Sequence, residues 1–206
     1  METKQTMIIV IAAVAVVACV AAAVIMMNGN NSDDPVDPVF PDLNENVILV
    51  YFSATEVTDG VAHKIKDYLG CDIYRIEPVV PYTKEDLERD NPDSRVSKEN
   101  KDPSFRPPIA GDKIDLSSYS TIVLGFPIWY HKEPQIIMTF LDQYDLSGKN
   151  IVPFCTSWSA GISGARADIM LNEPDAKVYA GGQFPSGYSE DSIYSWLDSI
   201  GMKKKQ

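Results

Sequence analysis

Residues 47–58 read VILVYFSATEVT, an apolar run that leads directly into a turn rich in hydroxyl groups. The first six residues are apolar and mostly β-branched or aromatic, which predicts a strand buried on both faces, as in a parallel sheet. Residues 60–69 then carry apolar side chains at helical spacing, and Gly70 predicts the end of that helix. The stretch therefore predicts a strand, a polar turn and a helix in succession.

The same alternation continues along the chain. Strands that alternate with helices indicate βαβ units around one parallel sheet, so the predicted fold class is α/β. Further strands are expected over 71–76, 121–126, 150–155 and 177–180, and further helices over 133–144, 164–171 and 190–200.

Residues 77–119 interrupt this pattern. They are rich in Pro and charged residues, and they predict at most one short helix, near residues 84–89. A connection of this length inside a compact domain usually has a functional role or is an added ornament.

An unbroken apolar run, MIIVIAAVAVVACVAAAVIMM, occupies residues 7–27. A helix of this length spans a hydrocarbon core of roughly 30 Å, so residues 1–27 are expected to be a membrane anchor or a signal segment. Lys4 precedes the run and acidic residues follow it, so the positive-inside rule places the domain outside the cytoplasm.

Two other interpretations of this segment stay open. It is also compatible with a cleaved signal peptide, which would release the domain, and with lipid attachment at Cys19. In each case residues 28–45, rich in Asn, Asp and Pro, are expected to form a flexible linker. The domain is expected over 46–201, and residues 202–206 form a basic tail.

The charge balance limits the possible partners. The chain has 18 Lys and Arg against 29 Asp and Glu, a formal net charge of −11. A surface of this sign repels phosphate backbones, so no nucleic-acid partner is expected. Cys71 and Cys155 lie far apart without metal-ligand spacing, so no metal is expected, and both are interpreted as small buried hydrophobic residues.

Three stretches follow the ends of predicted strands, where ligands bind in open parallel sheets. The first contains three hydroxyl groups just before a helix, which suits a phosphate ringed by hydroxyls and backbone N–H groups. Simple capping of the helix, with Thr58 as the N-cap, is an equally good explanation. The candidate ligand residues here are Ser53, Thr55, Glu56, Val57 and Thr58.

The second stretch contains two adjacent aromatic side chains that could flank a planar ring, although one of them could pack on the core instead. Its candidate residues are Pro127, Ile128, Trp129 and Tyr130, followed by His131, which is expected to be an exposed loop residue rather than a proton donor.

The third stretch has small residues that let backbone donors approach the edge of a heteroaromatic ring. Trp158 could stack on that ring or lie over an empty pocket. The candidate residues are Thr156, Ser157, Trp158, Ser159 and Gly161.

These motifs together resemble the flavodoxin-like proteins. The strand, Ser53-x-Thr55-x-x-Thr58 and helix resemble the flavodoxin phosphate loop, and GFPIWY (125–130) and PFCTS (153–157) are similar to the loops that hold the isoalloxazine in one subfamily. PYTKEDL and NPDSR in the long connection, and YSWLDSIG near the end, are similar to that subfamily too.

The resemblance covers about residues 46–201. It implies a doubly wound three-layer sandwich with a five-stranded parallel sheet in the order 2-1-3-4-5. In the chain this domain stands behind the apolar N-terminal segment, which is expected from its own sequence to be a transmembrane helix. It also implies FMN as the cofactor. Under that strand order Cys71 and Cys155 lie on strands separated by others, so a disulfide between them is not expected.

The chain departs from the subfamily in two ligand loops. The subfamily usually has glycine where this chain has Glu56, and its third loop is glycine-rich where this chain has Trp158 and Ser159. A carboxylate beside a phosphate costs electrostatic energy unless it points into solvent.

Two functions are therefore carried forward. The first is an FMN-dependent redox protein that transfers electrons to a partner protein or reduces small acceptors such as quinones, with the flavin supplying the chemistry. The second is a binding or scaffold module with the same fold that has lost tight FMN binding. A hydrolase is not expected, because nothing suggests a Ser-His-acid arrangement.

Overall fold

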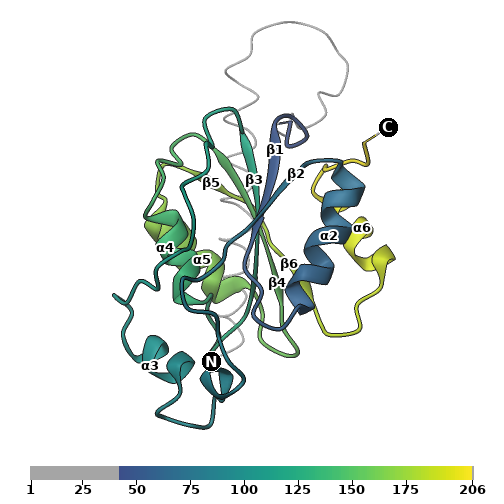
Figure 1. Ribbon diagram of the computed structural model, residues 1–206. Coiled ribbons are helices and arrows are strands. Elements are labelled where there is room, and N and C mark those ends of the chain that lie inside the picture. The colour runs from purple at the N-terminus through teal and green to yellow at the C-terminus, as the bar shows by residue number, and fades with distance from the viewer. Residues whose placement is uncertain (1–41, 206) are drawn as a thin grey trace, which may run out of the picture. The chain divides into compact units, whose positions relative to one another are not determined.

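A parallel sheet runs through the middle of the computed structural model, which describes residues 42–205 (Figure 1). Its strand order is β2-β1-β3-β4-β5, and all pairs are parallel, as expected from the sequence. The strands are β1 (Val47–Tyr51), β2 (Asp72–Arg75), β3 (Thr121–Pro127), β4 (Asn150–Thr156), β5 (Lys177–Val178) and β6 (Gly182–Phe184).

The last position of the sheet differs from the prediction of one strand over 177–180. The edge is shared by two short strands, because β5 pairs with the start of β4 and β6 pairs with its end. At Gly181, between them, an added Cβ would lie 2.5 Å from Ile162 and 3.0 Å from the carbonyl oxygen of Pro153. Because glycine has no Cβ, the chain between β5 and β6 can pass close to Ile162 and to the backbone of Pro153.

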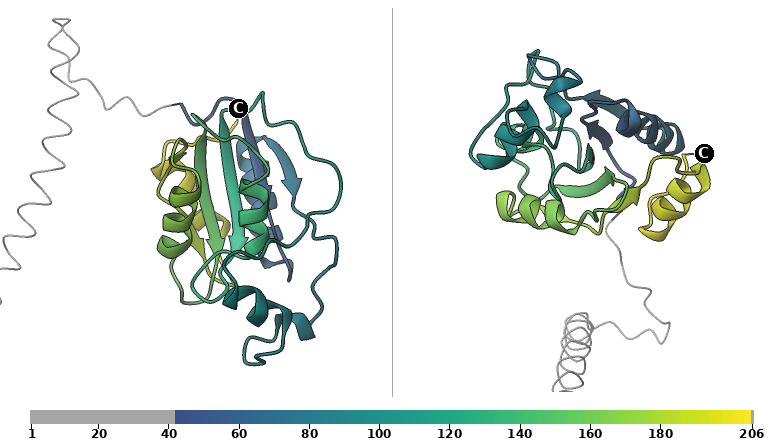
Figure 2. Two further views of the ribbon diagram at one scale, coloured as in Figure 1. Left: turned by 90° about the vertical axis from the view of Figure 1, so that its left-hand side faces the viewer. Right: turned by 90° about the horizontal axis from the view of Figure 1, so that it is seen from below.

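Helices cover both faces of the sheet, as the two views in Figure 2 show. Helices α2 and α6 lie on one face, and α4 and α5 lie on the other, with α3 beyond them (Figure 1). The helices are α2 (Val57–Leu69), the 3₁₀ turn η1 (Glu85–Leu87), α3 (Arg95–Lys101), α4 (Gln135–Leu141), α5 (Ser163–Asn172) and α6 (Glu190–Ser199).

The central strands are buried on both faces, as their unbroken apolar runs predict. In β1, Ile48 and Val50 pack into the core beneath α4 and α5, while Leu49 and Tyr51 pack into the core beneath α2 and α6. The period of two along a strand thus supplies both cores from one sequence.

The connection over 77–119 contains more structure than the sequence analysis expects. The short helix expected near residues 84–89 is present as η1, but α3 was missed. Ser94 caps α3 by accepting a hydrogen bond from the backbone N–H of Ser97. A helix of seven residues carries too little periodicity to be distinguished from a loop by pattern alone.

Both ends of the expected domain extend further than the predicted boundaries. Leu43, placed in the linker over 28–45, is buried, and Asn44 bonds the carbonyl of Gly201 and the N–H of Lys203. Met202, placed in the basic tail, is also buried, and Lys205 donates to the carbonyl of Tyr68. Apolar residues outside the periodic pattern therefore close the core beneath α2 and α6.

Within residues 42–205 no helix is long and apolar enough to cross a membrane. The anchor or signal segment expected over 7–27 lies outside the described residues.

The two cysteines of the domain are free thiols, as expected. Cys155 on β4 is buried, while Cys71, just before β2, is partly exposed rather than buried. Burial raises the pKa of the Cys155 thiol to about 12, so it remains protonated and is a poor nucleophile.

Candidate functional site

The three stretches expected to bind a ligand meet at the carboxyl edge of the sheet. Thr58 in the first turn of α2 shares a 2.7 Å hydrogen bond with Thr156 at the end of β4, and both side chains are buried. The N–H of Ile128 donates to the carbonyl of Thr156 over 3.0 Å. The end of β4 therefore links the first and the second stretch.

The first stretch forms a loop between β1 and α2. Ser53 is 4% exposed, and its hydroxyl oxygen has no hydrogen-bond partner in the described residues. Thr55 is exposed, and Val57 begins α2. An unpartnered buried hydroxyl beside a helix N-terminus has the chemistry that an anionic ligand would satisfy.

The capping explanation for Thr58 is wrong. The N-cap of α2 lies two residues earlier than expected, at Glu56, and there is no side-chain cap. Thr58 points into the core toward Thr156 instead. One of the two hydroxyl groups donates its hydrogen in this bond. The hydroxyl that accepts it can still donate its own hydrogen to a ligand.

Glu56 does not lie among the hydroxyl groups as an uncompensated charge. Its backbone is left-handed, with φ 61°, a conformation that glycine adopts at little cost. Its carboxylate accepts two hydrogen bonds from Arg75, at 2.9 and 3.2 Å, and its side chain is 66% exposed. The expected electrostatic cost is therefore reduced by pairing and by solvent.

Arg75 organises the outer side of this loop. It donates to the carbonyl of Ser53 over 3.2 Å, and its guanidinium lies 3.1 Å from Asp59 and 2.8 Å from Glu77. The hydrogen bonds with Glu56 raise the pKa of Arg75, so the guanidinium stays charged. One cation thus joins three carboxylates and the loop backbone.

Arg75 was not predicted as a site residue. It ends β2, directly opposite Tyr51 at the end of β1. The strand order could have identified it, because adjacent parallel strands end at the same edge, and a charged residue at the end of β2 must lie beside the loop that follows β1.

The second stretch forms a tight turn after β3. Trp129 and Lys132 exchange backbone hydrogen bonds of 2.8 and 3.0 Å. The two central residues, Tyr130 and His131, both have positive φ, 49° and 68°. Residues other than glycine adopt this backbone conformation at an energetic cost. His131 is exposed, as predicted.

Both aromatic residues of this turn are only partly buried, and they have different partners. Trp129 packs edge-on against Phe52 and Tyr82, with ring centroids 5.7 and 5.2 Å apart. Tyr130 instead bonds the hydroxyl of Ser97 over 2.7 Å. Pro127 is partly buried and Ile128 belongs to the core.

The long connection packs on this turn, which the sequence did not reveal. Tyr130 donates to the carbonyl of Arg89 over 2.8 Å, and Arg89 in turn donates to the carbonyl of Ile128. Tyr82 packs on Trp129. These contacts hold the turn from the outside, so the connection is part of the candidate site.

The third stretch is the least constrained of the three. Ser157 accepts a hydrogen bond from the N–H of Ala160 over 3.0 Å, and its own N–H donates to Phe184 on β6. Trp158 is 79% exposed, and Ser159 and Gly161 are exposed as well. Trp158 therefore does not stack on the other two stretches.

Residues 42–205 contain no cluster of His, Cys, Asp and Glu that could hold a metal ion. The site consists of hydroxyl groups, backbone N–H groups and aromatic rings. This set suits a ligand with a phosphate at one end and a planar ring at the other.

Comparisons with solved structures give close matches. A candidate flavoprotein of Bacteroides eggerthii is 36% identical, covers 77% of this chain and 99% of its own, and superposes with a TM-score of 0.71. Another, from Bacteroides uniformis, is 34% identical over 75% of this chain and 98% of its own, with a TM-score of 0.72.

A more distant match shares the fold. A flavoprotein of Lactobacillus acidophilus is 18% identical over 76% of this chain and 98% of its own, with a TM-score of 0.59, and was solved in complex with FMN. No curated protein matches the chain.

A comparison with protein families matches residues 46–200 to the family described as flavodoxin. This is about the extent that the sequence resemblance covers, and it is three quarters of the chain. The chain belongs to the flavodoxin family, whose cofactor is FMN.

Proposed function

We propose that this chain binds FMN at the carboxyl edge of its sheet and works as a redox protein. It would pass electrons to a partner protein or reduce small acceptors such as quinones. The observation that carries the proposal is the buried hydroxyl of Ser53, which has no partner in the described residues and lies beside the N-terminus of α2.

The first loop would hold the phosphate. Ser53 and Thr55 supply hydroxyl donors, and the first N–H groups of α2 lack partners within the helix. The helix dipole adds a partial positive charge at this end. Thr58 and Thr156, which hold each other in place, orient the loop and leave one hydroxyl hydrogen free to donate.

The other two loops would hold the ring. Trp129 is partly buried and rigidly packed, so it offers an aromatic surface at low entropic cost. Residues 156–161 follow the end of β4 at the same edge of the sheet, so their backbone N–H groups could bond the ring. Bound FMN supplies the electron transfer, while these residues bind it, orient it and limit its contact with water.

A module that has lost FMN is the second candidate. Glu56, Asp59 and Glu77 surround a single guanidinium, which leaves this side of the phosphate loop with more negative than positive charge. This arrangement repels a dianion and favours a module without flavin.

The colour of the purified full-length chain separates the two candidates. A flavoprotein is yellow and quenches added FMN in a fluorescence titration, whereas the module is colourless and leaves FMN fluorescence unchanged. Riboflavin, which lacks the phosphate, is the matched control ligand.

Ser53→Ala tests the phosphate site. A hydrogen bond to a charged group contributes about 1.5–3 kcal/mol, so this variant should bind FMN roughly tenfold or more weakly. Its affinity for riboflavin should change little. An equal loss of affinity for FMN and for riboflavin would show that Ser53 does not bind the phosphate.

We also propose that the segment over 7–27 anchors the domain at a membrane, on its outer side, which rests on the apolar run and on the charges that flank it. A reporter fused to the C-terminus of the full chain should be active only outside the cytoplasm. Activity inside the cytoplasm would contradict this orientation.

A further inference from the structure

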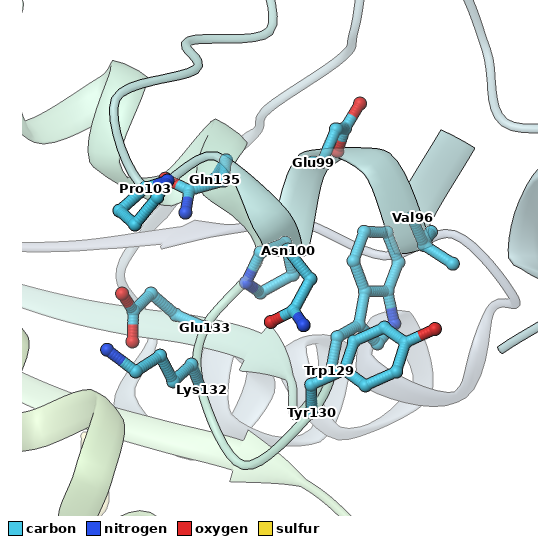
Figure 3. A pocket seen from close by; sticks show the side chains of 10 residues that line it. Val96, Glu99, Asn100, Pro103, Trp129, Tyr130, Lys132, Glu133 and Gln135 are labelled. Atoms are coloured by element: carbon cyan, nitrogen blue, oxygen red, sulfur yellow. The ribbon is translucent and has the colours of Figure 1, made fainter. Parts of the chain in front are cut away.

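A cavity beside the expected FMN site lies between α3 and the residues that lead from β3 into α4 (Figure 3). Its volume is about 140 Å³. An engineered cavity of similar volume holds a benzene molecule, so a ligand of about six heavy atoms would fit. Of the residues expected to bind FMN, only Trp129 and Tyr130 also line this cavity, which we call the α3 pocket.

The α3 pocket contains a buried carboxyl group. Glu133 is 6% exposed, and one of its two carboxyl oxygens has no hydrogen-bond partner in the described residues. Figure 3 shows its side chain on the pocket wall, with the carboxamide of Asn100 nearer the middle. An unpartnered buried carboxylate is costly, so a ligand that pairs with it would gain that energy back.

The neighbouring cations are already paired with other groups. Lys132 lies 2.7 Å from Asp168 on α5, and Arg106 lies 2.6 Å from Asp142. Both therefore reach carboxylates other than Glu133. Lys132 itself lines the pocket, and its charge is balanced by Asp168.

The remaining walls of the pocket suit a cation. Trp129 and Tyr130 line it with aromatic side chains, and aromatic rings attract ammonium groups. Asn100 adds an amide oxygen that can accept a hydrogen bond. A carboxylate, a carbonyl oxygen and two aromatic rings around a small cavity form the usual surroundings of an organic ammonium ion.

We propose that the α3 pocket binds a small organic cation, an alkylammonium ion of a few carbon atoms, with Glu133 as its counter-ion. None of the residues of the phosphate loop lines this pocket.

Binding at this site is coupled to a proton. Burial raises the pKa of Glu133 to about 7, and the groups that modify it are Asp168 on α5, Lys132 beside it and Arg106 from the long connection. Glu99 of α3 also lines the pocket, where its carboxylate is paired with Arg95. A cation favours the ionised carboxylate, so its binding should release a proton near pH 7 and strengthen as the pH rises through 7.

An NMR titration of the full-length chain tests the site, with propylammonium as the ligand and 1-propanol as its neutral counterpart. Propylammonium should shift the indole N–H signal of Trp129, assigned with Trp129→Phe, while propanol should not. The shift should saturate at lower ligand concentration at pH 8 than at pH 6.

Glu133→Gln keeps the size of the side chain and removes its charge. It should weaken propylammonium binding roughly tenfold or more and abolish the dependence on pH. Glu88→Gln, an exposed glutamate in the same connection as α3, is the matched control and should leave binding unchanged. Equal binding of propanol, undiminished binding by Glu133→Gln, or no shift with propylammonium would each overturn the proposal.

Discussion

The loop after β1 and the loop after β3 each carry a glutamate at the same edge of the sheet, and the two residues are in opposite situations. Glu56 is 66% exposed and accepts two hydrogen bonds from Arg75. Glu133 is 6% exposed and has a carboxyl oxygen without a partner. Burial and pairing, rather than residue type, decide what a charge costs at this edge.

The sequence predicts that Glu56 weakens phosphate binding, and it predicts no role for Glu133. In the structure the buried Glu133, rather than the paired Glu56, is the carboxyl group with the larger electrostatic cost. Glu56 stands where the resemblance predicts glycine, but it pairs with a guanidinium from the neighbouring strand, which it shares with Asp59 and Glu77. Glu133 is the first residue of the helix expected over 133–144, where a glutamate is common, yet its side chain is buried.

The largest expected effect is on stability at Glu133. Its pKa is raised from 4.5 to about 7 by burial. Between these values the folded chain keeps a proton that the unfolded chain loses, so stability falls as the pH rises from about 4.5 to 7. Above pH 7 this costs up to about 3 kcal/mol.

Glu133→Gln should remove this dependence on pH. Urea denaturation of the full chain at pH 5 and pH 8 should show the variant gaining stability over the wild type at pH 8 but not at pH 5. Glu88→Gln serves as the control. A parallel pH dependence in wild type and Glu133→Gln would contradict the burial argument.

The next effect concerns Arg75. Arg75→Gln leaves Glu56, Asp59 and Glu77 without their shared cation, beside the place where the phosphate is expected. FMN should bind about tenfold more weakly, a change of about 1.4 kcal/mol. Fluorescence titration measures this, and the loss should be smaller at high salt.

A double variant sharpens this test. Arg75→Gln combined with Glu56→Gln removes the cation and one released anion together, so it should recover much of the lost affinity. Neighbouring charges that act as a unit show such non-additive effects. If the double variant is as weak as Arg75→Gln alone, the Arg75–Glu56 pair does not act on the phosphate site.

Most of the fold could be predicted from the sequence. Strands buried on both faces, such as β1 and β3, give short apolar runs followed by turn residues, and the helices alternate with them. The failures are short elements. Helix α3 has seven residues, and β6 has three, so neither carries a periodic signal.

The candidate site could be predicted only in part. The three loops were identified because they follow strand ends. Their partners were not, because Arg75 meets Glu56 across 19 residues of sequence and Arg89 meets Tyr130 across 41. Side-chain pairing across strands depends on register and rotamer, which residue patterns do not contain.

A smaller effect is expected for Glu56→Gly. Glycine relieves the left-handed backbone at this position and leaves Arg75 with two carboxylate partners, Asp59 and Glu77, instead of three. FMN should bind roughly fivefold more tightly, about 1 kcal/mol. Glu56→Gln, which removes the charge but keeps the strain, separates the two causes. No gain in either variant would show that Arg75 already compensates Glu56 fully.

The smallest effect is expected for Trp158, which stands with Ser159 where the resemblance predicts a glycine-rich loop. Trp158 is 79% exposed, so it has little packing to lose, and Trp158→Gly should change the FMN affinity less than twofold, under about 0.4 kcal/mol. Trp129→Ala is the matched comparison, because Trp129 is held by Phe52 and Tyr82 before any ligand arrives. A stacked ring contributes about 1–3 kcal/mol, so Trp129→Ala should weaken FMN by fivefold or more in the same titration. If Trp158→Gly weakens FMN as much as Trp129→Ala does, then Trp158 closes over the flavin on binding, and the exposed third loop is a lid rather than a drifted part of the site.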